Sequence, residues 1–106
     1  MNRTYNITSG VQDWLKSHAE DLYNDVLEAA ELFALTDQEG VTVCTIRSIT
    51  GVTNYVLADP DRVVESLHKA EMHFAEKEVY EKAARARDCG KLWADKALIY
   101  RKRNSH

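Results

Sequence analysis

Residues 58–103 decide the predicted fold, and they read ADPDRVVESLHKAEMHFAEKEVYEKAARARDCGKLWADKALIYRKR. Asp59 is suited to cap a helix, because its carboxylate can accept the unpaired backbone N–H groups of the first turn. Pro60 fits the first helical position, where its missing N–H costs nothing. From Pro60 to Cys89 there is no glycine and no further proline, and Ala, Glu, Lys and Arg dominate. A long helix is therefore expected over 60–89.

Gly90 is the expected end of that helix, because glycine readily takes the positive φ of a helix C-terminus. A second, shorter helix is expected over Lys91–Arg103. Its apolar residues are too many for one stripe, so we expect one side to pack on the domain and the other to meet a partner. In the longer helix, the residues expected to face the core are Val63, Val64, Leu67, Ala70, Phe74, Ala75, Val79, Ala83 and Ala86.

Upstream of residue 58, the pattern predicts a strand, one helix and a β-hairpin. The helix carries apolar residues at intervals of three and four, and the two β-branched runs are joined by a short segment that contains glycine. The expected elements are a strand at Arg3–Ile7, a helix from a capping box at Ser9 and Gln12 to about Leu35, a turn at Thr36–Gly40, and strands at Val41–Ile46 and Val52–Leu57 around the connection Arg47–Gly51.

These elements together predict the α+β class in a single domain, 1–106. Two long helices and a short C-terminal helix pack on a small antiparallel hairpin or sheet, in the order β-α-β-β-α-α. The length of 106 residues is near the commonest domain size. No apolar run approaches the roughly 18 residues of a membrane span, and the start lacks the apolar core of a signal peptide. We therefore expect a cytoplasmic protein with no membrane partner.

The charge is unevenly distributed along the chain. Residues 1–60 hold three basic and nine acidic side chains, whereas residues 61–106 hold eleven basic and eight acidic ones. A basic end with interleaved aromatic residues is one pattern of a nucleic-acid interface. The net charge of the whole chain is −3, however, whereas nucleic-acid-binding domains are usually basic. The helix expected from Ser9 to about Leu35 is rich in acidic residues, which indicates a second alternative function. The chain would then be a phage-type inhibitor that imitates phosphates with Glu20, Asp21, Asp25, Glu28 and Glu31.

Residues that could carry catalysis or hold a metal are isolated in this sequence. Cys44 and Cys89 form no C-x-x-C pair, and nothing beside them marks an activated thiol. Glu65 and His68 have the spacing of a di-iron ligand pair, but such sites need two pairs and further glutamates. We therefore expect no enzymatic activity, no metal and no cofactor, with both thiols unpaired in a reducing compartment.

The C-terminal quarter of the chain resembles a known family. Glu81-Lys82, Asp88-Cys89-Gly90-Lys91-Leu92-Trp93, Ala97 and Arg101-Lys102-Arg103-Asn104-Ser105 are similar to the AraC negative regulator family, short helical proteins of bacteria and their phages. The resemblance implies a non-enzymatic protein that binds and inhibits a transcription regulator, with Leu92, Trp93 and Ala97 in the contact. The predicted hairpin has no counterpart in that family.

The sequence therefore predicts a small regulatory protein that docks on another protein through its C-terminal helical segment. Trp93 beside a cationic rim is the expected anchor, because aromatic residues and arginines dominate interface energetics. A homo-oligomer, most simply a dimer, is also expected. The predicted partner-binding residues are Lys91, Leu92, Trp93, Lys96, Ala97, Leu98, Tyr100, Arg101, Lys102 and Arg103.

Overall fold

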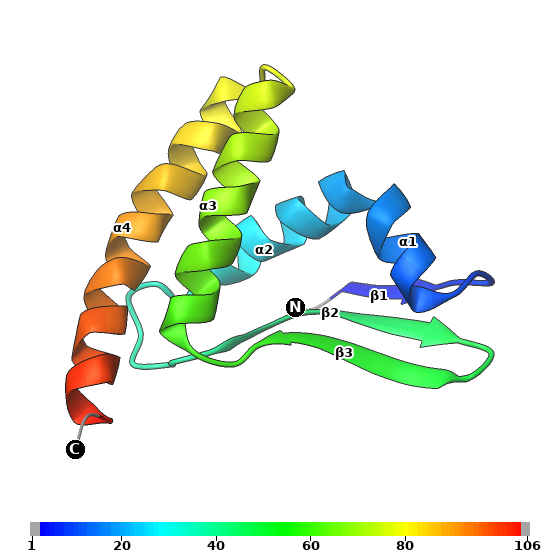
Figure 1. The fold of residues 1–106 in the computed structure, drawn as a ribbon, viewed down its shortest axis with the longest axis horizontal. Helices are drawn as coiled ribbons and strands as arrows, with labels where there is room; N and C mark the ends of the chain where they lie inside the picture. Colours follow the sequence, from blue (N-terminus) through cyan, green and yellow to red (C-terminus); the bar gives the residue numbers. More distant parts are fainter. Residues whose placement is uncertain (1–2, 105–106) are drawn as a thin grey trace.

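The computed structural model describes residues 3–104 and has the predicted α+β class (Figure 1). Its element order is β-α-α-β-β-α-α, because the first predicted helix is divided in two. The elements are β1 (Arg3–Asn6), α1 (Val11–Ser17), α2 (Ala19–Phe33), β2 (Val41–Ser48), β3 (Gly51–Leu57), α3 (Pro60–Glu76) and α4 (Tyr80–Arg103).

The three strands form one sheet in the order β1-β2-β3. β2 and β3 pair antiparallel through a two-residue loop, Ile49-Thr50, which confirms the predicted hairpin. β1 instead pairs parallel to β2, so the sheet is mixed and not wholly antiparallel as expected. The parallel pairing needs a long crossover, and α1 and α2 supply it.

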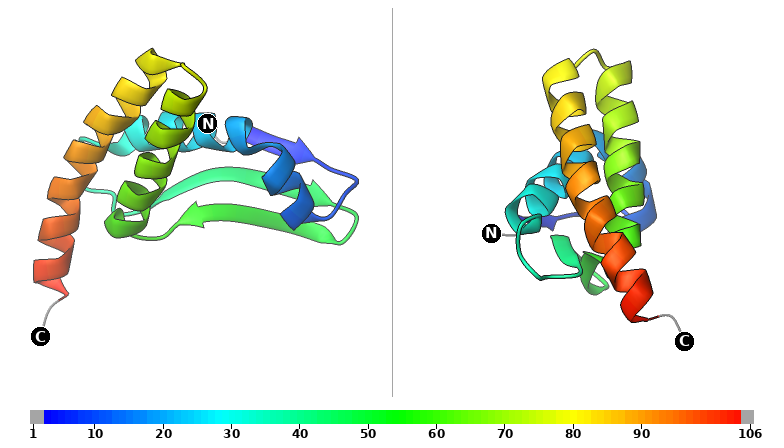
Figure 2. Two further views of the ribbon diagram at one scale, coloured as in Figure 1. Left: turned by 45° about the horizontal axis from the view of Figure 1, so that its top comes forward. Right: turned by 90° about the vertical axis from the view of Figure 1, so that its left-hand side faces the viewer.

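The core lies between the sheet and the helices on one of its sides (Figures 1 and 2). The central strand β2 contributes Val41, Cys44 and Ile46, all at most 2% exposed. A bulge between Thr42 and Cys44 adds Val43 to the buried set. On the opposite side of the sheet, Val52, Asn54 and Val56 of β3 are all exposed, so only one face of the sheet is covered.

The helix predicted from Ser9 to Leu35 is interrupted at His18, and its capping box is not formed. Gly10 occupies the N-cap of α1 and makes no side-chain cap. At the end of α1, the Ser17 hydroxyl donates to the Asp13 carbonyl, and His18 Nδ1 lies 3.0 Å from the Trp14 carbonyl. Such local side-chain bonds compete with the helical ladder, and the chain turns into α2 there.

The predicted helix end at Gly90 is wrong, because α3 ends at Glu76 and α4 continues through Gly90. Glu78 has φ 62°, and the chain reverses there in a Schellman motif. The Val79 N–H donates to the Phe74 carbonyl at 2.8 Å, and the Glu78 N–H donates to the Ala75 carbonyl at 3.0 Å.

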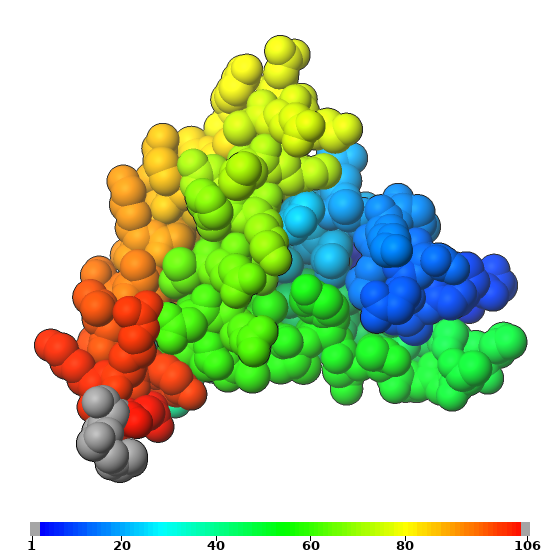
Figure 3. Space-filling model, in the orientation of Figure 1, coloured from blue at the N-terminus to red at the C-terminus, as the bar shows by residue number. Residues whose placement is uncertain are grey.

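α3 and α4 therefore form an antiparallel helical hairpin, which rises from the body of the molecule (Figures 1 and 3). Gly90 lies inside this pairing, where a Cβ would come 4.0 Å from the Cβ of Leu67. Small residues let the two backbones approach, and α3 supports α4 at the position where an isolated helix would end. The predicted cap of α3 is confirmed, because the Arg62 N–H donates to the Asp59 carboxylate at 3.0 Å.

Replacing Glu78 by glycine is expected to raise the free energy of unfolding by up to about 1 kcal/mol, because glycine tolerates this positive φ without a Cβ clash. Glu76→Gly is the matched control, since Glu76 is helical, and it is expected to lower the free energy of unfolding by about 0.5–1 kcal/mol. Urea unfolding followed by circular dichroism measures both. Equal destabilisation by the two variants would contradict the left-handed turn.

Candidate functional site

The C-terminal half of α4 is fastened to the body by Trp93, which is fully buried. Its indole Nε1–H donates to the Ala30 carbonyl of α2 at 2.8 Å. Ala97, one turn further along, is also 0% exposed. The predicted exposure of Trp93 as an interface anchor is therefore wrong, and neither residue is accessible to a partner in this structure.

The physical reason is the position of Trp93 on the helix. Ala86, Cys89 and Ala97 on the same side of α4 are also buried, and the Ala30 carbonyl of α2 accepts the indole N–H. The spacing of Ala86, Cys89, Trp93 and Ala97 is that of a single helical stripe. Trp93 belongs to the stripe that faces the core, and the surplus apolar residues of the segment lie elsewhere.

Three of the cations predicted to contact a partner are instead bound within the chain, and these are Lys96, Arg101 and Arg103. Lys96 Nζ donates to the carbonyls of Phe33 at 2.6 Å and Gln38 at 2.8 Å, and it lies 3.8 Å from the centroid of the Trp93 ring. Burial lowers the pKa of the Lys96 ammonium. Together, the two hydrogen bonds of Lys96 hold the end of α2 and the following loop against α4.

Arg101 and Arg103 are engaged in the same way by carboxylates of the body. The Arg101 guanidinium forms a two-pronged bond to Asp61 at the start of α3, and this bond holds the pKa of the Asp61 carboxyl below its usual value. Arg103 pairs with Glu39. Among the described residues, Lys91 and Lys102 have no such ion pair, so these two exposed cations remain available to a partner.

The exposed apolar residues of this segment are Leu92, Leu98 and Ile99, which are 43%, 54% and 62% exposed. At about 100° per residue, Leu92 and Ile99 lie on almost the same side of α4, and Leu98 lies about 100° from Ile99. Tyr100 is half-buried. We call Lys91, Leu92, Leu98, Ile99 and Lys102 the outer surface of α4.

The predicted set omitted two residues that extend or border this surface. Ile99 is absent from that set, although its spacing of seven from Leu92 could have identified it. Leu35 is 87% exposed and lines, with Leu92, a pocket of about 360 Å³ between the end of α2 and α4. Nothing in the sequence places the end of α2 beside α4.

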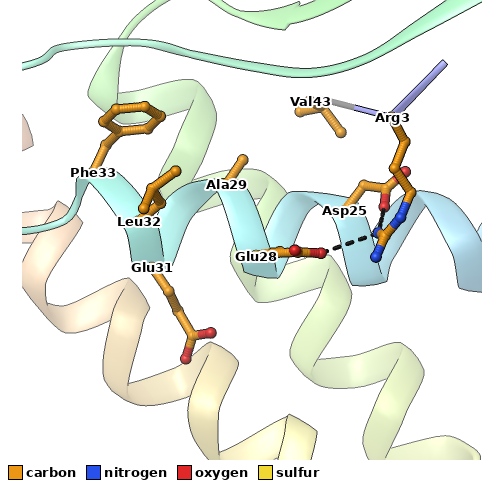
Figure 4. Close-up of a pocket in the computed structure, with 8 residues that line it drawn as sticks. All are labelled: Arg3, Asp25, Glu28, Ala29, Glu31, Leu32, Phe33 and Val43. Carbon is orange, nitrogen blue, oxygen red and sulfur yellow. Dashed lines mark hydrogen bonds and ion pairs between the residues drawn. The ribbon is translucent and has the colours of Figure 1, made fainter. Parts of the chain in front are cut away.

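A second polar site lies between β1 and α2 (Figure 4). Asp25 is only 3% exposed, and its carboxylate accepts hydrogen bonds from the Arg3 guanidinium and the Tyr5 hydroxyl. Arg3 also pairs with Glu28 at 3.0 Å. Burial raises the pKa of Tyr5, and the hydrogen bond to Asp25 raises it further.

This cluster borders a pocket of about 400 Å³, which Leu32, Phe33 and Val43 also line. Both oxygens of the buried Asp25 carboxylate already have donors from β1. The arrangement therefore attaches a four-residue strand to α2, and we assign it a structural role. The charges of Asp25 and Glu28, which the sequence offered as a phosphate mimic, are used here within the chain.

The two thiols are buried in different parts of the core. Cys44 on β2 is 0% exposed and Cys89 on α4 is 4% exposed, and burial raises the pKa of each to about 11. Both thiols are therefore protonated at neutral pH, the form that is a poor nucleophile. Within residues 3–104, no three His, Cys, Asp or Glu side chains are grouped as a metal site.

Comparison of the chain with protein-family models, with curated proteins and with solved structures found no match. None of the helices formed by the described residues has the length and apolar character needed to cross a bilayer. Ser105, which contributes to the resemblance in the C-terminal quarter, lies outside the described residues. A function for this chain therefore has to be argued from its own surfaces.

Trp93→Ala is expected to lower the free energy of unfolding by about 3–5 kcal/mol, because it opens a cavity between α2 and α4 and removes the bond to Ala30. Leu92→Ala, at the neighbouring exposed position, is the control and is expected to cost less than about 1 kcal/mol. Chemical denaturation with matched baselines measures both. A cost for Trp93→Ala as small as that of Leu92→Ala would show that the indole is not in the core.

The stability of the protein is expected to fall as the pH rises above about 9. Each thiol has a pKa of about 11 when folded, above the ordinary value of 9.0, so the unfolded chain loses its proton first. At pH 10 this costs on the order of 1 kcal/mol for each thiol. Thermal unfolding between pH 8 and pH 10 measures the decline.

Cys89→Ala is the matched variant for this pH series. It removes one of the two thiols, so its free energy of unfolding should fall less steeply with pH than that of the wild type, whatever the cavity costs at pH 8. Identical slopes in the two proteins would contradict the role of the buried thiol. The raised pKa of Tyr5 adds a further loss above pH 10 in both proteins.

Proposed function

We propose that this chain is a small non-enzymatic regulatory protein that docks on another protein through the outer surface of α4. One observation supports the proposal above the others. Leu92, Leu98 and Ile99 are exposed on the last turns of a helix whose opposite side is fixed in the core by Trp93 and Ala97. Exposed aliphatic residues on one rigid element are typical of interaction sites.

The outer surface of α4 is held ready for binding. Arg101 and Arg103 fasten the last two turns to Asp61 and Glu39, and Lys96 fastens the middle of the segment to the loop after α2. A partner therefore does not have to order this helix, and less binding free energy is lost to conformational entropy. The surface presents its side chains in one fixed arrangement.

The chemistry of the surface favours an amphipathic segment with acidic residues beside its apolar stripe. Leu92 and Ile99 supply helical anchor positions seven residues apart, a spacing used in helix-to-helix recognition. Lys91 and Lys102, the two cations of this surface, would face the acidic residues of the partner. The resemblance to the AraC negative regulator family implies a transcription regulator as the partner, with Leu92 in the contact.

Two alternative functions receive less support from the geometry. For nucleic-acid binding, Arg85, Arg101 and Arg103 are already paired with Glu31, Asp61 and Glu39, so few cations remain for phosphates. For an acidic phosphate mimic, Asp25 and Glu28 are paired with Arg3, and Glu31 is paired with Arg85.

The unpaired thiols Cys44 and Cys89 support a cytoplasmic location.

The proposal is tested with three baits in affinity purification from the native cell: wild type, Leu92→Ser/Ile99→Asp, and Met72→Ser. Met72 on α3 is 59% exposed and serves as the matched control, away from the proposed surface. A partner is expected with wild type and Met72→Ser, and its recovery should fall with the double variant. Calorimetry with the purified partner should then show a Kd weakened by at least about tenfold.

Circular dichroism and unfolding curves establish that the three baits are folded alike. Equal recovery of every captured protein with all three baits would overturn the proposal. Retention of the purified partner with unchanged affinity by the double variant would overturn it as well. Loss of the partner with Met72→Ser, but not with the double variant, would place the docking surface on α3.

A further inference from the structure

The outer edge of β3 is unpaired among the described residues. The sheet ends with β3 on the side away from β1 (Figures 1 and 2). The strand carries none of the usual protections of a sheet edge, since Gly51–Leu57 contains no charged residue and no proline. The bulge of the hairpin is on β2, so β3 itself is a regular seven-residue strand.

We propose that this edge pairs, antiparallel, with the same edge of a second copy of the chain, about a two-fold axis at Asn54. The two three-stranded sheets then form one sheet of six strands, a common size. This surface is separate from the outer surface of α4, so the inference does not depend on the proposed function.

The sequence of β3 is self-complementary about Asn54. In this register Val52 of one copy lies opposite Val56 of the other, Thr53 lies opposite Tyr55, and Asn54 lies opposite Asn54. Residues two apart direct their backbone N–H and C=O groups to the same edge of a strand. Placing Val52 opposite Val56, and Asn54 opposite Asn54, therefore brings together backbone groups that face outward from the two edges.

The same register covers exposed apolar side chains. Val52 and Val56 are 62% and 52% exposed on the uncovered face of the sheet. They would form two Val–Val pairs on either side of the axis, and such β-branched pairs stabilise antiparallel strands. No like charges meet across the pairing, because β3 has no charge.

The tip of the hairpin provides a second contact with the neighbouring copy. Ile49 is 91% exposed at this tip, and in this register it lies level with Asp59 of the other copy. A groove of about 410 Å³ between β3 and α3 begins there, lined by Tyr55 and Leu57 on the strand and by Arg62 on the helix.

The paired edge itself carries no charge. Arg47 is the single charged residue of the hairpin 41–57, and it lies on β2, beside Val52 and one strand inward from the paired edge. The paired strand spans only about 24 Å, which gives an interface at the small end of the range for stable dimers. We therefore infer a dimer that dissociates on dilution.

Sedimentation velocity across a concentration series tests this dimer. The wild type is expected to shift from monomer to dimer as its concentration rises. Asn54→Lys places two like charges opposite each other on the axis and should raise the dimer Kd by at least about tenfold. Thr4→Lys is the matched control, because Thr4 is an exposed residue on the opposite edge strand beside the uncharged Thr45, and it should leave the dimer unchanged.

A charge-swap experiment protects the test against a folding defect. An equimolar mixture of Asn54→Lys and Asn54→Asp should form heterodimers, although each variant alone is monomeric, since the axis then joins opposite charges. A wild type that stays monomeric at every concentration would overturn the proposal. A dimer that Ile99→Asp abolishes and Asn54→Lys leaves intact would overturn it too, and would assign association to α4.

Discussion

The burial of Trp93 is the constraint on which the rest of the structure depends. Among the described residues its indole is the largest fully buried side chain, and its N–H bonds to the Ala30 carbonyl in the last turn of α2. α2 is in turn attached to β1 through Asp25 and packs on β2. One aromatic ring thus joins the C-terminal helical hairpin to the N-terminal half of the chain.

Charged residues complete this attachment around the buried ring. Lys96 satisfies carbonyls at the end of α2 and in the following loop, where helix termini leave acceptors unpaired. Arg101 and Arg103 bind carboxylates on two different parts of the body. The cations of the basic end therefore act mainly as internal fastenings, and the aliphatic residues between them remain exposed on the outer surface of α4.

In the sheet, by contrast, the hydrogen-bonding groups of the backbone are only partly paired within the chain. β2 is paired on both sides, whereas β3 has a partner on one side only. With the helices on one face, both the other face and this edge lie at the surface. The two proposed contacts are therefore independent: side chains of a rigid helix carry one, and the backbone and valines of an edge strand carry the other.

The sequence by itself determined the elements that depend on local chemistry. The Asp59–Pro60 start of α3, the hairpin around Gly51 and the α+β class all follow from capping, turn chemistry and hydrophobic period. These features depend on residues that are close together in the sequence, so they can be predicted without knowing how the rest of the chain folds. The candidate site was predictable only as a segment: the apolar surplus and cations of 91–103 were visible, but not which side of the helix each residue occupies.

Only the tertiary structure decided which residues are covered. Trp93 is buried because it lies on the side of α4 that packs against α2, where the Ala30 carbonyl accepts its N–H, and no local pattern brings Ala30 beside it. α4 passes through Gly90 because α3 supports it, while Glu78 takes the positive φ that reverses the chain. Burial and chain reversal depend on residues far apart in sequence, so they are settled when the elements pack together.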